Sequence, residues 1–382
     1  FPTRRSSDLL DGVPVAWKDL VDVKGAPTTC ASELFRNRDV AEDDAPIVKN
    51  CAAAGMVVLG KVNLTEFAFS GLGLNPHYGA PINPYGGDAP RAPGGSSSGS
   101  AVSVAAGLAP IAIGTDTGGS VRIPAAFNGL VGYKSTQGHI NKERVQALSL
   151  TLDTIGPLGQ SVEDCVLMER VLRQQLVVVP RAAGLADLTL VVPENLVFEE
   201  AQDAVVANFE AALSKLSAAG VTITRRRFDV FDGMLESSAA HGTLATAEAF
   251  YALGSHVDGP DGKQIDRRVV SRIERGRHQT AADYIAITET RRMLNQKLGA
   301  EMAGPTFLVM PTVAITAPEI APLDADDDVF HATNMTALRN TMIGNYFDLP
   351  GFTIPSGTDA QGLPTGVLFN ADTGQDELLM CY

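Results

Sequence analysis

Apolar and polar residues near the start of the chain follow the order strand, helix, strand. The segment Val13–Lys18 alternates between the two kinds of position, which predicts a strand that ends near Lys18. Pro46–Ala54 predicts a helix, because proline suits a first helical turn and Gly55 stands where a C-cap is expected. Met56–Leu59 predicts a second, fully apolar strand. This order is typical of parallel α/β units.

The same rhythm continues toward the C-terminus. Ser98–Leu108 predicts a helix of small residues, followed by the strand Pro110–Ile113 and a tight glycine turn, Gly114–Ser120. Further apolar segments predict the strands Leu188–Val192, Val221–Ile223 and Phe307–Met310, the helices within Glu199–Ala219 and Thr280–Leu298, and a pairing of Phe352–Pro355 with Gly366–Phe369. Because neither an internal repeat nor a linker interrupts the pattern, we expect one large α/β domain.

Composition narrows the class of partner. The chain has 382 residues, of which 45% are hydrophobic and 19% charged, as in globular proteins. A net charge of −14, without a long basic cluster, argues against nucleic acid or an anionic membrane surface as the main partner. The most apolar stretch, Ala101–Gly114, is shorter than the ~20 residues of a bilayer span. We therefore expect a small-molecule substrate and no membrane segment.

The cysteines suggest neither a metal site nor a disulfide framework. They are far apart and form no C-x-x-C pair, at Cys30, Cys51, Cys165 and Cys381. This usage fits a reducing compartment, so a cytoplasmic location without metal or cofactor is expected.

The two ends of the chain are unusual. Phe1–Leu9 reads like a translated sequencing adapter, so we expect residues 1–9 to be non-native and exclude them from the fold. Residues 10–382 are then the domain, which we expect to be truncated at both ends.

Several glycine-rich motifs have competing interpretations. Gly55–Val62 nearly matches a phosphate-binding loop, but Val62 replaces the hydroxyl that binds magnesium. Gly71–Gly73 lacks the third glycine of a dinucleotide fingerprint. Ser97 lies in a G-x-S-x-G sequence, yet the proline-containing Gly86–Pro93 before it cannot be the buried strand that a nucleophile elbow requires. A flexible linker is a further interpretation of the Gly/Ser run, but the residues that follow pass straight into a predicted helix, a strand and a second glycine turn, which disfavours it.

The segment Gly114–Pro124 is the most informative, because an apolar strand ends there in a glycine turn followed by Ser120. Amide cleavage needs a nucleophile beside backbone N–H donors that stabilise the developing oxyanion. Ser120 is the candidate nucleophile, and the backbone of Thr117, Gly118, Gly119 and Ser120 is the candidate oxyanion hole. An ordinary turn between strand and helix is the alternative.

Lys18 is the best candidate base. An amine at the end of an apolar strand can be desolvated, which lowers its pKa and frees its lone pair, although most lysines are simply solvated. The histidines have no obvious strand-end setting with an acidic partner, so the sequence does not support a Ser-His-Asp triad; they are His77, His139, His241, His256, His278 and His331.

Five segments together resemble the amidase signature family, over about Gly12 to Glu377. They are Gly12–Asp19 (GVPVAWKD), Gly60–Phe67 (GKVNLTEF), Gly94–Ser100 (GGSSSGS), Gly114–Pro124 (GTDTGGSVRIP) and Val309–Thr312 (VMPT). The resemblance implies an α/β/α domain around a mixed, mostly parallel sheet. It also implies a catalytic triad in which Ser120 is the nucleophile, Ser96 a bridging serine with a cis peptide, and Lys18 the base.

The expected function is hydrolysis of a small-molecule amide through an acyl-enzyme, without metal or cofactor. The alternatives are the glutamine-hydrolysing A component of a tRNA-dependent amidotransferase and a non-catalytic family member. We expect the substrate pocket to be built mostly between residues 140 and 345, and a homodimer is left open. Arg122 has two interpretations, a contact to a substrate carboxylate or a structural role, and the second is favoured.

Overall fold

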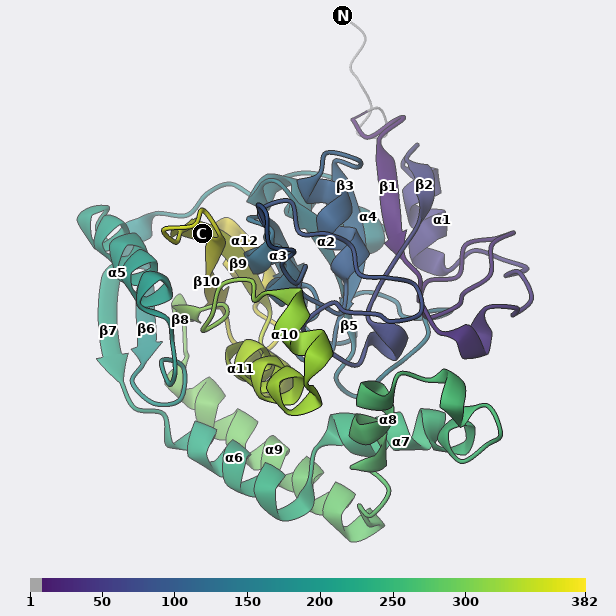
Figure 1. The fold of residues 1–382 in the computed structure, drawn as a ribbon. Helices are drawn as coiled ribbons and strands as arrows, with labels where there is room; N and C mark the ends of the chain where they lie inside the picture. Colours follow the sequence, from purple (N-terminus) through teal and green to yellow (C-terminus); the bar gives the residue numbers. More distant parts are fainter. Residues whose placement is uncertain (1–8) are drawn as a thin grey trace, which may run out of the picture.

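The computed structural model describes residues 9–382 (Figure 1), so the expected non-native segment 1–9 lies outside the described residues except for Leu9. Within these described residues, ten strands form one sheet in the order β2-β1-β3-β5-β4-β9-β10-β8-β6-β7. Their bounds are β1 Pro14–Lys18, β2 Val57–Val62, β3 Ile111–Asp116, β4 Val131–Lys134, β5 Thr154–Gly159, β6 Thr189–Pro193, β7 Thr222–Arg226, β8 Thr306–Pro311, β9 Gly351–Thr358 and β10 Pro364–Asn370.

The sheet is mixed, and its two kinds of pairing are separated in space. Strands β2, β1 and β3 are parallel at one flank, and β8, β6 and β7 are parallel at the other. These flanks contain the strand–helix–strand units that the sequence predicts. Antiparallel pairing joins them through β5, β4, β9 and β10. The prediction of one α/β domain around a mixed sheet is confirmed. The expected parallel strand pairs lie at its two flanks.

Helices cover both faces of the sheet. One face carries α1 Pro46–Ala53, α4 Val162–Leu172, α5 Asp203–Ala218 and α12 Asp376–Cys381. The other carries α2 Ser98–Ala105, α3 Arg122–Phe127, α6 Asp229–His241, α9 Ala281–Glu301 and α11 Asp327–Tyr346. Helices α7 Leu244–Val257, α8 Arg267–Glu274 and α10 Ile320–Ala325 complete the fold, with α7 and α8 beside the ends of α6 and α9 (Figure 1).

Alternation along the strands explains why both faces hold helices. In β6, Leu190 and Val192 pack toward α5, whereas Val191 between them packs toward α6 and α9. In β1, Val15 and Trp17 pack toward α1, and Ala16 packs toward α2. A strand whose side chains are apolar on both faces is stable only between two helical layers. The α/β/α arrangement implied by the resemblance is confirmed.

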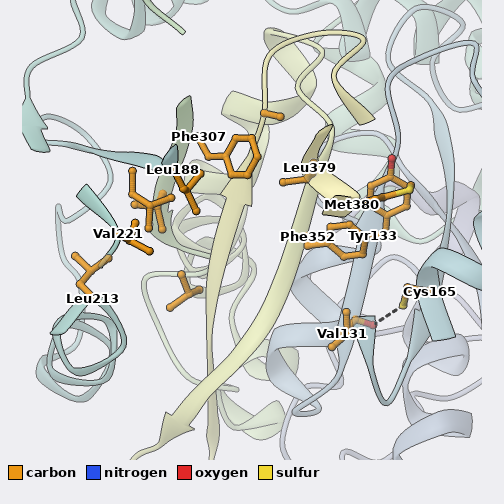
Figure 2. Close-up of a cluster of buried hydrophobic side chains, with 14 of the residues drawn as sticks. Val131, Tyr133, Cys165, Leu188, Leu213, Val221, Phe307, Phe352, Leu379 and Met380 are labelled. Atoms are coloured by element: carbon orange, nitrogen blue, oxygen red, sulfur yellow. Dashed lines mark hydrogen bonds between the residues drawn. The ribbon is translucent and has the colours of Figure 1, made fainter. Parts of the chain in front are cut away.

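The core under α4, α5 and α12 is shown in Figure 2. Tyr133 of β4 stacks on Phe352 of the adjacent β9, with ring centroids 4.4 Å apart and planes 26° apart. The Tyr133 hydroxyl donates a hydrogen bond of 2.5 Å to Asp376 Oδ1 at the start of α12. This contact fixes the C-terminal helix to the antiparallel part of the sheet.

Strand β2 covers most of the apolar strand predicted at Met56–Leu59 and continues to Val62. It is the edge of the sheet, and Val57 and Leu59 are 52% and 51% exposed. Apolar composition alone cannot distinguish an edge strand from a central one, because this depends on which strands pair beside it. None of the helices in residues 9–382 combines the length and apolar character that a membrane crossing requires.

Gly156 of β5 provides a test of the packing between strands. A Cβ there would overlap the backbone oxygen of Tyr133, whereas a Cβ at Gly60 of β2 would meet no atom within 4 Å. Gly156→Ala should therefore lower the free energy of unfolding by about 1–3 kcal/mol. Gly60→Ala, the matched control, should change it by less than about 0.5 kcal/mol. Urea unfolding measures both, and equal midpoints would contradict this account of the sheet.

Candidate active site

Lys18 is buried at the carboxyl end of β1. Its Nζ lies 2.7 Å from Ser96 Oγ and donates a hydrogen bond of 2.8 Å to Thr115 Oγ1 on the neighbouring strand β3. Because β1 and β3 are parallel, their carboxyl ends reach the same edge of the sheet. The fold also brings together Lys18 and Ser96, which are 78 positions apart in the chain.

Burial changes the chemistry of this amine. Loss of hydration lowers the pKa of Lys18 from 10.5 to about 7, and the more distant charges of Asp153 and Asp116 oppose the shift only in part. The amine therefore has a substantial neutral fraction near pH 7, as a general base requires.

Ser96 lies in an ordered loop that leads directly into α2, so the linker interpretation of the Gly/Ser run is wrong. The peptide bond between Gly95 and Ser96 is cis, as the resemblance implies. Gly95 N–H donates to the Gly71 carbonyl at 2.8 Å, and Thr65 N–H donates to the Ser96 carbonyl at 3.1 Å. These bonds hold the loop against the segment that follows β2.

Ser97 has a structural role. Its buried hydroxyl donates to the Thr115 carbonyl at 3.2 Å and accepts from the Thr115 N–H at 3.3 Å. Its own N–H donates to the Ser120 carbonyl at 3.2 Å. Ser97 therefore fastens the serine loop to the turn that carries Ser120, and an elbow nucleophile at this position remains excluded because no strand leads into the loop within the described chain.

The turn after β3 is organised by Asp116. This buried carboxylate accepts hydrogen bonds from Gly119 N–H at 2.8 Å and Val121 N–H at 3.1 Å. The prediction of four free oxyanion donors therefore needs correction at Gly119, whose amide is already bound to a side chain. The amides of Thr117, Gly118 and Ser120 have no hydrogen-bond acceptor within residues 9–382.

Gly119 contributes its shape. Its φ is +130°, and a Cβ would overlap the Thr341 hydroxyl of α11. That hydroxyl donates a hydrogen bond of 2.7 Å to the Gly118 carbonyl. Only glycine allows the turn to pass so close to α11 in this conformation.

Arg122 takes the structural role that was favoured. It is fully buried and donates to Asp116 from Nε at 3.0 Å and from Nη2 at 2.9 Å. Asn345 of α11 completes the cluster, because its Nδ2 donates to Asp116 at 2.8 Å and its Oδ1 accepts from Arg122 at 2.6 Å. Although burial alone would raise the pKa of Asp116, the Arg122 charge holds it well below its usual range. Sequence reasoning missed Asp116, Thr115 and Asn345 as parts of the site.

A cavity of about 260 Å³ opens beside Ser120, Thr117 and Gly118. Its other walls come from the loop at Ala68–Ser70, from Leu148 and Leu152, and from helices α6, α7, α8, α9 and α11. These walls fit the prediction that residues 140–345 build most of the pocket. Among the serines of the segments Gly94–Ser100 and Gly114–Pro124, Ser120 is thus the one that lines a ligand-sized cavity.

Histidine does not reach this cavity, since none lines it within the described chain. Three histidines do have acidic neighbours that the sequence did not indicate: His77 with Glu66 at 3.7 Å, His139 with Asp376 at 3.4 Å and His241 with Asp283 at 2.9 Å. No group of three or more His, Cys, Asp or Glu side chains in residues 9–382 is arranged to hold a metal ion.

Residues 2–380 match the protein-family model described as Amidase. The chain belongs to the amidase signature family. It is 34% identical to a 2-amino-5-chloromuconic acid deaminase from Comamonas testosteroni, over 94% of this chain and 77% of that protein. It is 32% identical to the A component of a glutamyl-tRNA(Gln) amidotransferase from Symbiobacterium thermophilum, over 94% and 78%. A solved structure described as an amidase superposes with a TM-score of 0.86 at 27% identity, covering 97% of this chain and 83% of that one.

Membership of the amidase signature family makes the chain an amidohydrolase that acts on C–N bonds. The serine- and glycine-rich segments of the family resemblance are the segments that the fold gathers around Lys18 and the cavity.

The Asp116 cluster of this amidase can be tested by stability. Asp116→Asn leaves the Arg122 guanidinium buried without its counter-charge, which should lower the free energy of unfolding by about 3–5 kcal/mol. Glu210→Gln is the control, because the pair of Glu210 with Arg225 is 45% and 42% exposed and should contribute less than about 1 kcal/mol. Denaturant unfolding measures both values. If both variants lost the same small free energy of unfolding, Asp116 would not be the essential counter-charge of Arg122.

Proposed function

We propose that the protein hydrolyses a carboxylic amide through an acyl-enzyme on Ser120, with Ser96 and Lys18 relaying the protons. Support comes chiefly from one observation, the approach of the buried Lys18 amine to within 2.7 Å of Ser96 Oγ. A neutral amine there accepts a proton from Ser96, while its N–H donates to Thr115. The pKa of about 7 makes that neutral form available near physiological pH.

In the first half-reaction, Ser120 Oγ attacks the amide carbonyl carbon. Its proton passes to Ser96, whose own proton passes to Lys18, so that the lysine becomes an ammonium. When the tetrahedral intermediate collapses, the C–N bond breaks and the same proton returns through Ser96 to the departing nitrogen. Ammonia or an amine leaves, and the acyl group remains as an ester on Ser120.

Water completes the cycle by the same route. Lys18 and Ser96 remove a proton from the attacking water, the ester C–O bond breaks, and Ser120 recovers its proton as the carboxylic acid leaves. Each proton taken in one step is returned in the next, so the cycle leaves the enzyme unchanged.

The negative charge that develops on the carbonyl oxygen needs donors that are already in place. Thr117, Gly118 and Ser120 have backbone amides without another acceptor in residues 9–382, and all three residues border the cavity. We propose that these amides form the oxyanion hole, and that the Asp116 bonds to Gly119 and Val121 hold the turn in shape.

A second candidate function is that of the glutamine-hydrolysing A component of a tRNA-dependent amidotransferase. The similarity to such a component from Symbiobacterium thermophilum favours it. Stable partner proteins in a pull-down, together with glutaminase activity, would establish this role. The similarity to a deaminase named for 2-amino-5-chloromuconic acid makes acidic substrates a class to include in any activity screen.

Removal of the relay should abolish turnover. Ser120→Ala and Lys18→Ala should each lower kcat by about 10⁴-fold or more, since groups that act as a unit fail together. Ser96→Ala should cost about 10²- to 10⁴-fold. Ser103→Ala on α2, whose hydroxyl donates only to the Ser100 carbonyl, is the control and should retain activity. Amide hydrolysis and labelling by a serine-reactive fluorophosphonate, followed by peptide mass spectrometry, measure these effects. Full activity in Ser120→Ala would reject the proposal.

The pH dependence follows from the sign of the lysine shift. Because the base acts when neutral and its pKa is lowered to about 7, kcat/KM should fall about tenfold per pH unit below 7 and level off above it. A neutral amide such as pentanamide keeps ionisation of the substrate out of the profile. A rise centred near pH 10.5 would show that Lys18 titrates like a solvated lysine.

A further inference from the structure

The cavity beside Ser120 carries an unbalanced charge. Most of its walls are apolar, from Leu148, Leu152, Leu244, Ile287 and Leu338 among others. Of the lining side chains within residues 9–382, only two are charged, and both are arginines: Arg272 on α8 and Arg275 at its C-cap. A protein with a net charge of −14 thus presents a purely positive pair to its ligand.

Arginines on the same helix that do not line the cavity have carboxylate partners. Arg268 pairs with Asp266 at 2.9 Å, and Arg267 pairs with Asp327 at 2.7 Å. Arg272 and Arg275, in contrast, have no salt bridge and no side-chain hydrogen bond to any described residue. The Nε atom of Arg272 is buried without a hydrogen-bond partner.

Arg272 is held in place by packing instead of by an anion. Its guanidinium lies over the ring of Phe69, which also lines the cavity, at 4.6 Å from the ring centroid. Burial, followed by the like charge of Arg275, lowers the pKa of Arg272 to about 10, so the side chain remains charged near neutral pH. Burial, together with the positive charges of Arg272 and Arg275, also lowers the pKa of the nearby His331. A partly desolvated cation without a counter-ion is unfavourable, and a bound carboxylate would relieve that cost.

We propose that the cavity selects amides whose acyl part ends in a carboxylate, bound by Arg272 with Arg275, and excludes amides with an ammonium group beside that carboxylate. This inference rests on the proposed function, because it assigns the substrate class to the same site. The apolar walls would contact the hydrocarbon between the two ends of such a substrate. No acidic side chain within residues 9–382 lines the cavity, so an ammonium group would enter without a partner and close to two like charges.

Monoamides of dicarboxylic acids fit this description, and glutamine does not. Glutaramate is glutamine without its ammonium group, and pentanamide is glutaramate with a methyl group in place of the carboxylate. Comparison of these compounds therefore separates the contributions of the two charged groups. Succinamate with butanamide, and adipamate with hexanamide, extend the comparison to shorter and longer chains.

The test measures kcat/KM for all these amides in the wild-type protein. At least one acidic monoamide should exceed its neutral counterpart by about 10- to 100-fold, the effect of hydrogen bonds to a charged group. The kcat/KM for glutaramate should also exceed that for L-glutamine. Arg272→Gln should remove most of the preference for the acid, mainly through KM, so that the ratio of kcat/KM for the acidic amide to kcat/KM for its neutral counterpart falls toward one. Arg272→Lys should restore part of the preference. Arg267→Gln, at a side chain that is 71% exposed, is the matched control and should keep it.

The outcomes separate the two proposals. Ser120-dependent hydrolysis in which neutral amides match the acidic ones, or in which glutamine matches glutaramate, would overturn the substrate class and leave the proposed function standing. Failure of every amide to turn over would reject the proposed function and the inference with it. Calorimetry of glutarate with Ser120→Ala gives an independent measurement: binding that weakens at least tenfold when Arg272→Gln is added supports the anion site, and unchanged binding contradicts it.

Discussion

The burial of the Lys18 amine between two parallel strands is the constraint on which the proposed chemistry depends. The amine contacts two hydroxyls, those of Ser96 and Thr115, and has no carboxylate within 4 Å among residues 9–382. A direct ion pair would hold the lysine in its charged form, whereas desolvation without such a pair lowers its pKa. The site thus obtains a base for neutral pH without histidine. The sheet supplies this environment because helices cover both faces of β1 and β3.

A second constraint holds the two serine-bearing turns together. Ser97 bonds to Thr115 and to the Ser120 carbonyl, so the loop of Ser96 and the turn of Ser120 have a fixed separation. Asp116 anchors the second turn through backbone amides and through Arg122 and Asn345. Since Asn345 belongs to α11, which also lines the cavity, the substrate-binding wall and the turn share one hydrogen-bonded cluster. Such a cluster gives the rigidity that preorganised donors require.

The sequence predicted those features that short segments encode. The strand ending at Lys18, the small-residue helix after Ser96 and the turn before Ser120 all have local signals, and all were found. Contacts over long distances in the chain were not predictable in this way. Asn345 reaches Asp116 across 229 positions. The bond from the Gly119 amide to Asp116 spans only three positions, and the glycine pattern of the turn did not indicate it. The exposure of Val57 and the lack of a carboxylate partner for Arg272 within residues 9–382 likewise depend on which residues the folded chain places nearby.

The most direct test of this account is the ionisation of Lys18 itself. Carbon-13 labelling at lysine Cε, with Lys18→Met to assign its signal, allows nuclear magnetic resonance to follow the titration of this amine in the folded protein. The midpoint should lie near 7, far below the 10.5 of a solvated lysine. A midpoint near 10.5 would mean that the amine is charged at physiological pH, cannot accept the proton of Ser96 and therefore is not the base of the site.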